Sequence, residues 1–303
     1  SAASDVYKRQ SLKSSTTGND NTAVGKESLK DNTTGSNNTA LGFQALQNNT
    51  TADNNTAVGY ESLDANTTGT QNTGVGYKAL TLTTTGSYNS SLGGGALYSN
   101  TTGDRNTSVG VNALYSNTTA DNNTAVGANA LGSNTTGAEN TAVGRNAATA
   151  ITTGSTNVAI GYEALSAQTT GSNNTAVGGS ALKVNTTGTK NTAVGYYAGK
   201  TITTGPNNTA IGYEALRDCE TNGENTAVGA ECLMSNTSAN NTAVGWYAGR
   251  SNTTGNHNTF VGRAAAHQNT TGSYNIAIGG GTGVLYTYPS PRARTRWRMR
   301  SAG

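Results

Sequence analysis

Hydrophobic and polar positions recur along this chain at an interval of 17 residues. The unit reads N-T-A-V-G-Y-x-A-L-x-x-N-T-T-G-x-N, and we number its positions 1 to 17 from the first asparagine. Sixteen copies keep this register, with one interval of 16 residues. A chain without fixed structure has no reason to keep phase, so the pattern predicts a repeat architecture. The copies begin at Asn21, Asn38, Asn55, Asn72, Asn89, Asn106, Asn123, Asn140, Asn157, Asn174, Asn191, Asn208, Asn225, Asn241, Asn258 and Asn275.

Positions 2 to 4 of the unit predict a short β-strand. Position 4 is always Val, Ile or Leu, and position 2 is usually Thr but accepts Val158 and Ile276, so the two positions share one strand face. Position 3 is small in every copy except at Phe260. Position 9, mostly Leu, predicts a second apolar wall. The N-T-T-G stretch predicts a turn whose glycine is free to adopt positive φ.

These features predict an all-β fold, a parallel β-solenoid of 16 coils over residues 11–281. A helical repeat is disfavoured because glycine at position 5 of every copy would cost a helix about 1 kcal/mol each time. A leucine-rich repeat fits less well because its unit is longer and carries more leucines.

Two copies that lose the leucine at position 9 gain an isoleucine at position 12, as a small shared core would demand. The pairs are Ala148 with Ile151 and Gly199 with Ile202. No such exchange accompanies Gly249 or Ala266.

The composition cannot fill a thick core, because only 33% of the residues are hydrophobic. Stability must therefore come from stacked backbone ladders, asparagine and threonine columns, and other chains. No stretch approaches the ~20 apolar residues that a membrane-spanning helix needs, so we expect no membrane insertion.

No residue set predicts catalysis, a metal or a cofactor. His257 and His267 fall at different repeat positions, as do Cys219 and Cys232, and no carboxylates are paired. The chain is therefore expected not to be an enzyme.

A column of aromatic residues at position 6 is the candidate binding surface. Such side chains can stack on sugars or contact a host surface, or they can pack against neighbouring coils or chains. They are Phe43, Tyr60, Tyr77, Tyr162, Tyr196, Tyr213 and Trp246.

Two polar patterns give further candidates. The N-x-[ST] pattern marks formal glycan acceptors, although the repeat itself creates it wherever asparagine and threonine suit turns and ladders. The threonine columns at positions 13 and 14 suggest an ice-binding surface, although adjacent residues cannot share a strand face. The candidate acceptors are Asn32, Asn66, Asn100, Asn134, Asn185 and Asn252.

The copies "STNVAIGYEAL" (155–165) and "SYNIAIGGG" (273–281) carry N-[VI]-A-I-G. This motif resembles the head repeat of trimeric autotransporter adhesins, and the unit is similar to repeats of phage-type tail fibre proteins. The resemblance covers residues 11–281 and implies a left-handed β-roll in a homotrimer, outside the cell, on its surface or on a virion. It further implies a fibre shaft or head that acts as a rigid spacer and presents a receptor- or glycan-binding surface. The alternative is a carbohydrate- or ice-binding module. The small residue at position 3 fits close approach of three chains, or else faces solvent in a monomer.

The two ends do not fit the unit. Residues 1–10 ("SDVYKRQ" at 4–10) and 282–303 ("VLYTYPSPRARTRWRMR" at 284–300) resemble translated sequencing adapters, with a genuine basic tail at residues 284–303 as the alternative. The net charge is +3, of which residues 1–10 supply +1 and the five arginines of the tail +5, so the repeat region carries −3. We therefore expect no nucleic-acid partner.

Overall fold

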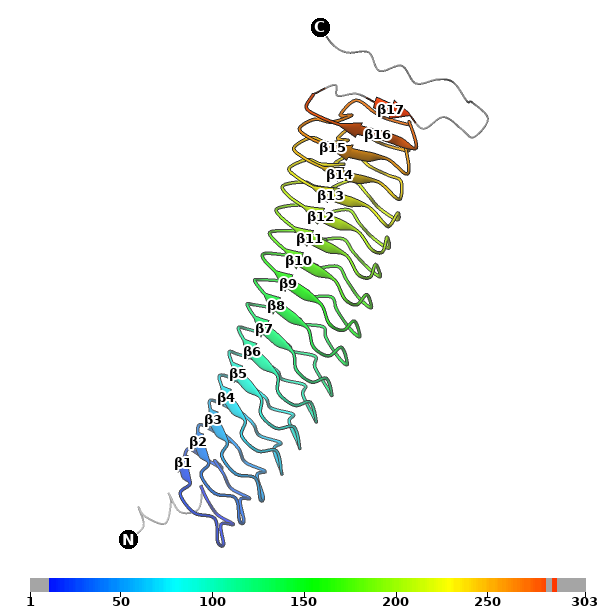
Figure 1. Ribbon diagram of the computed structural model, residues 1–303. Helices are drawn as coiled ribbons and strands as arrows, with labels where there is room; N and C mark the ends of the chain where they lie inside the picture. Colours follow the sequence, from blue (N-terminus) through cyan, green and yellow to red (C-terminus); the bar gives the residue numbers. More distant parts are fainter. Residues whose placement is uncertain (1–10, 282–284, 288–303) are drawn as a thin grey trace.

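A computed structural model describes residues 11–281 and 285–287, which stack as coils along one axis (Figure 1). Each repeat forms one coil, and coil 1 begins at Asn21. The strands are β1 (Thr22–Val24), β2 (Thr39–Leu41), β3 (Thr56–Val58), β4 (Thr73–Val75), β5 (Ser90–Leu92), β6 (Thr107–Val109), β7 (Thr124–Val126), β8 (Thr141–Val143), β9 (Val158–Ile160), β10 (Thr175–Val177), β11 (Thr192–Val194), β12 (Thr209–Ile211), β13 (Thr226–Val228), β14 (Thr242–Val244), β15 (Thr259–Val261), β16 (Asn275–Ile278) and β17 (Leu285–Thr287).

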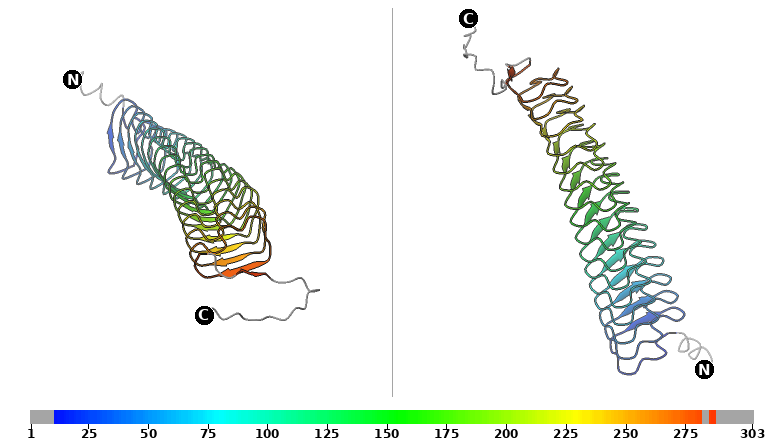
Figure 2. Two further views of the ribbon diagram at one scale, coloured as in Figure 1. Left: turned by 90° about the horizontal axis from the view of Figure 1, so that it is seen from above. Right: turned by 90° about the vertical axis from the view of Figure 1, so that its right-hand side faces the viewer.

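Strands β1 to β16 form one continuous parallel sheet along the rod (Figure 2). Each strand pairs with its counterpart in the next coil, so that Thr56 lies opposite Thr73. No helix occurs in the described residues. The predicted all-β parallel solenoid, with its strand at positions 2 to 4, is confirmed.

The single 16-residue interval is absorbed in a loop without disturbing the sheet. Thr226 still lies opposite Thr242. In an ordinary coil the position 12 side chain reaches the carbonyl three residues on, as Asn66 Nδ2 does at Gly69 (2.9 Å). Asn236 Nδ2 instead reaches Ser238, two residues on (2.7 Å). The missing residue therefore falls between positions 12 and 15.

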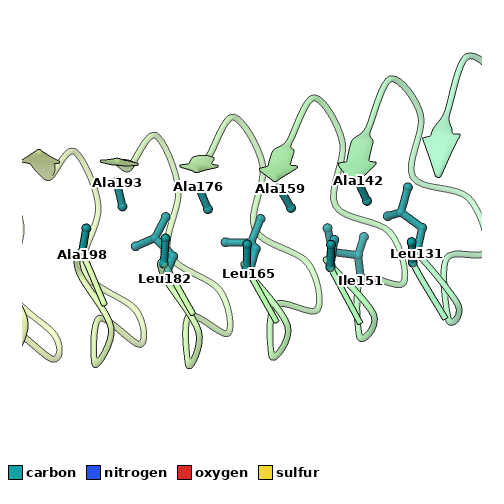
Figure 3. Close-up of a cluster of buried hydrophobic side chains, with 14 of the residues drawn as sticks. Leu131, Ala142, Ile151, Ala159, Leu165, Ala176, Leu182, Ala193 and Ala198 are labelled. Atoms are coloured by element: carbon teal, nitrogen blue, oxygen red, sulfur yellow. The ribbon is translucent and has the colours of Figure 1, made fainter. Parts of the chain in front are cut away.

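The core is one thin layer between the strand and the segment around position 9 (Figure 3). From coil 2 onward the residue at position 3 points inward and is buried, as Ala142 and Ala159 are. It is small because leucines such as Leu165 fill the opposite wall of the same chain. The expectation that position 3 is small because chains approach there is therefore wrong; positions 2 and 4 face outward instead.

Large side chains replace one another across this layer. A Cβ built on Gly199 would lie 2.9 Å from Ile202 Cδ1, so the isoleucine occupies the space of the missing leucine. A Cβ on Gly249 would lie 2.5 Å from Phe260 Cδ2. The volume of the leucine missing at Gly249 is therefore filled by Phe260, at position 3 of the following coil. A comparison of positions within one repeat did not predict this replacement.

Positive φ was expected at the glycine of the N-T-T-G turn, but it occurs at other positions of the repeat. The position 5 glycines have φ between 126° and 142°, as at Gly110 (132°), where a Cβ would also lie 2.7 Å from the carbonyl carbon of Gly127. The glycines of the N-T-T-G turns do not have positive φ. The position 9 leucines adopt the left-handed region, with φ from 47° to 55°. Dense packing holds this costly conformation in place.

Part of the C-terminal segment belongs to the sheet. Strand β17 pairs antiparallel with β16, with Ile276 opposite Tyr286. Residues 285–287 near the C-terminal end therefore belong to the sheet. Residues 1–10, 282–284 and 288–303, on which the remainder of the adapter interpretation falls, lie outside the described residues.

Candidate ligand-binding surface

Two asparagine ladders run through the interior of the rod. At position 1, Asn38 Oδ1 accepts a hydrogen bond from the Asn55 backbone N–H (2.9 Å), while Asn38 Nδ2 donates to the Ala52 carbonyl (2.8 Å). At position 12, Asn49 Nδ2 donates to Asn32 Oδ1 in the preceding coil (2.8 Å). Buried amides in such ladders satisfy one another and fix the stacking of the coils.

The candidate glycan acceptors belong to the position 12 ladder. All six are fully buried, and five of them donate through Nδ2 to a carbonyl inside the same coil. A glycan on any of these nitrogens is incompatible with the folded solenoid, because the nitrogen has no path to solvent. In the folded chain these asparagines are structural residues of the repeat and not glycan acceptors. They are Asn32, Asn66, Asn100, Asn134, Asn185 and Asn252.

The two threonine columns have different roles. The position 13 hydroxyl donates to the position 13 carbonyl of the next coil, as Thr50 Oγ1 does at Thr67 (3.1 Å). Position 14 threonines such as Thr51 are exposed. The two columns therefore do not form one free hydroxyl surface, and the ice-binding surface expected at positions 13 and 14 is reduced to one column.

The position 6 aromatics stack on one another along the rod axis. The ring centroids of Phe43 and Tyr60 lie 5.2 Å apart, and those of Tyr60 and Tyr77 lie 5.5 Å apart, with interplanar angles of 12° and 17°. Tyr196 and Tyr213 stack at 6.2 Å. Within a stack, each ring lies nearly parallel to its neighbour in the next coil.

In two coils whose position 6 residue is arginine, the guanidinium covers the ring of a neighbouring coil. The Arg145 guanidinium lies over the Tyr162 ring, 5.8 Å from its centroid, and that of Arg263 lies 4.9 Å from the Trp246 centroid. These are cation–π distances. The column therefore remains partly exposed without being a uniform platform. The exposed fractions of the side chains that are more than one third exposed are Tyr60 43%, Tyr77 61%, Tyr162 50%, Tyr196 49%, Tyr213 49% and Trp246 42%.

Most of the charged side chains at positions 7 and 10 of the repeat form ion pairs. Lys78 Nζ lies 3.2 Å from Glu61 Oε2, and Arg250 Nε lies 2.9 Å from Glu231 Oε2. Asp64 has no cation beside it, and its buried Oδ1 has no hydrogen-bond partner. Burial, and then the charges of Glu61 and Glu27, raise the pKa of Asp64 to about 6.

The column has an open gap at Gly94, the position 6 residue of the coil that contains β5. A Cβ built there would meet only the Tyr77 carbonyl oxygen, at 3.9 Å. The gap opens into a groove of about 440 Å³ that is lined by Tyr77, Lys78, Gly94, Gly95, Tyr98, Val111, Asn112 and Tyr115.

A second hollow continues the groove along the rod. It measures about 240 Å³ and shares Asn112 and Tyr115 with the first. The predicted column contributes only Tyr77, whereas Tyr98 and Tyr115 come from position 10 and stack on each other at 5.1 Å. Sequence reasoning missed both, because aromatics occur at position 10 in only these two copies.

The histidines and cysteines lie apart from this groove. Both cysteines are buried and free, and burial raises the pKa of the Cys232 thiol to about 12 and that of Cys219 to about 11. Residues 11–281 and 285–287 contain no group of three or more His, Cys, Asp or Glu side chains that could hold a metal ion. Over the same residues, no helix of sufficient length and apolarity to span a membrane is found.

Compared with known proteins, the chain matches no family model, no curated protein sequence and no solved structure.

Proposed function

We propose that this chain is a segment of an extracellular fibre, on a cell surface or a virion, serving as the shaft or head of an adhesin or tail fibre. The support is mechanical: sixteen parallel strands hold one register along the rod, and ladders of backbone and asparagine hydrogen bonds tie each coil to the next. A body of this kind keeps a binding surface at a fixed distance from its anchor. The proposal assigns it no enzymatic activity, cofactor, nucleic-acid partner or membrane insertion.

The observation that carries the proposal is the outer face of the sheet. Positions 2 and 4 present two columns without a charged residue in any coil. Large apolar side chains are open along it, with Val24 56%, Leu92 53% and Ile278 60% exposed. Nine of the sixteen position 4 side chains are exposed and the other seven are half-buried, so an apolar stripe runs the length of the rod. A contiguous exposed apolar surface of this kind marks an interaction site.

We propose that this face is where chains associate, as a homotrimer of left-handed solenoids. Unpaired, uncharged strand faces on three rods can close around a common axis and bury the aliphatic column. The alanine at position 3 lies inside each chain and takes no part in this contact. The outward-facing residues at positions 2 and 4 would make it.

Sedimentation equilibrium of the full chain tests this proposal. We expect three times the mass of one chain, and we expect Val126→Glu with Val143→Glu to give monomers, because two charges per chain would be buried without partners. The matched control is Thr136→Glu with Thr153→Glu, on the exposed position 14 column of the same coils. A monomeric wild-type chain, or loss of the trimer in the control alone, would contradict the proposal.

The alternative function is a carbohydrate- or ice-binding module. The groove beside Gly94 favours carbohydrate, because it combines aromatic walls with polar side chains. For ice, the threonines at position 14, such as Thr51 and Thr136, present exposed hydroxyls. Thermal hysteresis of a concentrated solution tests the ice-binding form directly, and its absence would remove that form.

A further inference from the structure

The aromatic column is interrupted beside Tyr77 in a way that leaves one ring face open. Tyr60 covers one side of the Tyr77 ring, with centroids 5.5 Å apart. On the other side the next position 6 residue is Gly94, which contributes no side chain. Tyr77 is accordingly the most exposed aromatic of the column, at 61%. Lys78 Nζ also lies over this ring, 5.6 Å from its centroid, and is paired with Glu61 of the preceding coil. The stack therefore ends at Tyr77, whose ring remains largely exposed toward Gly94.

Glycine at position 6 is not by itself enough to make such a site. Gly179 occupies the same position five coils further on, but there the ring of Tyr196 leans into the space, with Cδ2 3.1 Å from where a Cβ would be. At Gly94 the nearest atom is a backbone oxygen at 3.9 Å. The gap at Gly94 is thus a vacancy in the column, whereas the gap at Gly179 is filled by the protein itself.

The size of the gap suits a single ring. Tyr77 and Val111 are two coils apart, which corresponds to about 10 Å at the usual spacing of paired strands. A ring resting on Tyr77 at van der Waals distance, about 3.5–4.0 Å, would lie at the level of the missing side chain. Val111, which is 56% exposed, would close the other side.

The chemistry of the rim selects a sugar ring. A pyranose has an apolar C–H face that can rest on Tyr77, and hydroxyl groups at its edge that need partners. Tyr98, Tyr115 and Asn112 line the groove, and their hydroxyl and amide groups are donors and acceptors of the kind that these sugar hydroxyls need. An apolar aromatic ligand would use the ring face but leave these polar groups unpaired.

The charge of the groove argues for a neutral ligand. Lys78 is the one charged residue that lines it, and its Nζ lies 3.2 Å from Glu61 Oε2 in the preceding coil. The ammonium is therefore compensated within the protein. An anionic sugar would have to displace this ion pair or remain without a counter-charge.

The second hollow extends the site beyond one sugar. It shares Asn112 and Tyr115 with the groove and adds Asn129, Ser133 and Thr149, which are polar and uncharged. A linear chain of two or three linked pyranoses could place one ring on Tyr77 and continue over Tyr115. We propose that the groove between Tyr77 and Thr149 binds a neutral oligosaccharide, with Gly94 as the slot for one pyranose ring.

This inference rests on the receptor-binding part of the proposed function and names its ligand class and place. The test uses the full chain, fluorescently labelled, on a printed array of neutral trisaccharides (chitotriose, cellotriose, maltotriose) and of sialylated lactose. We expect binding to at least one neutral trisaccharide. We expect Gly94→Tyr, which completes the aromatic column, and Tyr77→Ala, which removes the ring, each to lower affinity for that trisaccharide about tenfold or more.

Matched variants separate this site from the rest of the column. Ala230→Tyr makes the same addition at position 6 eight coils away, and Tyr213→Ala removes an aromatic from a stack distant from the groove; both should change affinity less than twofold. Circular dichroism should show Gly94→Tyr folded, since its Cβ meets open space. Binding to sialylated lactose alone, no binding to any neutral trisaccharide, or equal loss in both sets of variants would overturn the proposal. Sedimentation of the same samples reports the fibre assembly separately.

Discussion

Asn134 lies one coil before Ile151, and its buried Oδ1 has no hydrogen-bond partner because Ile151 replaces the asparagine that would donate to it. Asn134 Nδ2 still donates to Asn117 Oδ1 (3.0 Å) and to the Gly137 carbonyl (2.9 Å). The ladder is thus interrupted at a defined coil. The same isoleucine fills the space that Ala148 leaves at position 9. The core of this coil is therefore filled at the cost of one hydrogen bond in the asparagine ladder.

A double-mutant cycle at Ala148 and Ile151 measures this exchange. Ile151→Asn alone should lower the free energy of unfolding by about 2–4 kcal/mol, because the cavity costs more than the new hydrogen bond to Asn134 contributes. Ala148→Leu alone should lower it by about 1–3 kcal/mol through overpacking. The double variant restores the repeat and should lie within about 1 kcal/mol of wild type. Urea unfolding followed by circular dichroism checks the series, and purely additive effects would contradict it.

A second cycle tests whether Phe260 supplies the bulk missing at Gly249. Phe260→Ala should cost about 3–5 kcal/mol, the usual range for a buried aromatic. Gly249→Leu alone should also destabilise, because its Cβ would lie 2.5 Å from the ring. Together the two substitutions recreate an ordinary leucine–alanine pair, and φ of 59° at Gly249 is close to that of the position 9 leucines. The expected result in chemical denaturation is rescue of most of the loss, and a double variant weaker than either single would refute the pairing.

Gly110 and Gly94 give a matched pair of glycine-to-alanine substitutions one coil apart. Gly110→Ala should lower the free energy of unfolding by at least about 2 kcal/mol, because φ is 132° and the new methyl would meet the Gly127 carbonyl carbon at 2.7 Å. Gly94→Ala should change it by less than about 0.5 kcal/mol, since its Cβ meets open space. Thermal denaturation of both variants distinguishes them. Equal effects would mean that the backbone at position 5 is not restrained as described.

Asp64 gives a prediction about pH. Its pKa is raised from 3.8 to about 6 in the folded chain, so between these values the folded state binds more protons than the unfolded state. Stability should therefore fall as the pH rises from about 4 to about 6. Asp64→Asn should be more stable than wild type at pH 7.5, by the order of 1 kcal/mol after screening of this half-buried group. The difference should vanish near pH 3.5, and a constant difference across denaturation curves from pH 3.5 to 7.5 would argue against ionisation as the cause.

Much of the fold could be predicted because the repeat reports the same local environment sixteen times. Alternation at positions 2 to 4 located the strand, but alternation alone does not say which face is inside. The leucine at position 9 decides that question, since it needs a small residue opposite it, and Ala142 or Ala159 can meet this need only from within. Replacement across a coil boundary, as at Gly249 and Phe260, could not be seen while each repeat was compared only with itself.

The candidate site was less accessible to sequence reasoning for a different reason. The column of aromatics was visible, but the open face of Tyr77 is created by a missing side chain at Gly94. Glycine at position 6 also occurs at Gly179, where the gap is filled, so residue type alone does not distinguish the two. The asparagines at position 12 show the converse: their motif suggested a modification at the surface, whereas their burial makes them part of the interior.

The strands contact only their nearest neighbours along the sheet, and this has a genetic consequence. A duplication of one whole repeat within the gene would insert a coil between two existing coils without altering the contacts of the others. The length of the fibre is thus open to recombination in steps of about 4.8 Å. The groove at Gly94 would move with its own coils relative to the ends of the rod, so variants with extra repeats would hold the same groove at a different distance from each end. Phe260 and Gly249 mark a boundary where this freedom is lost, because each needs the other's coil.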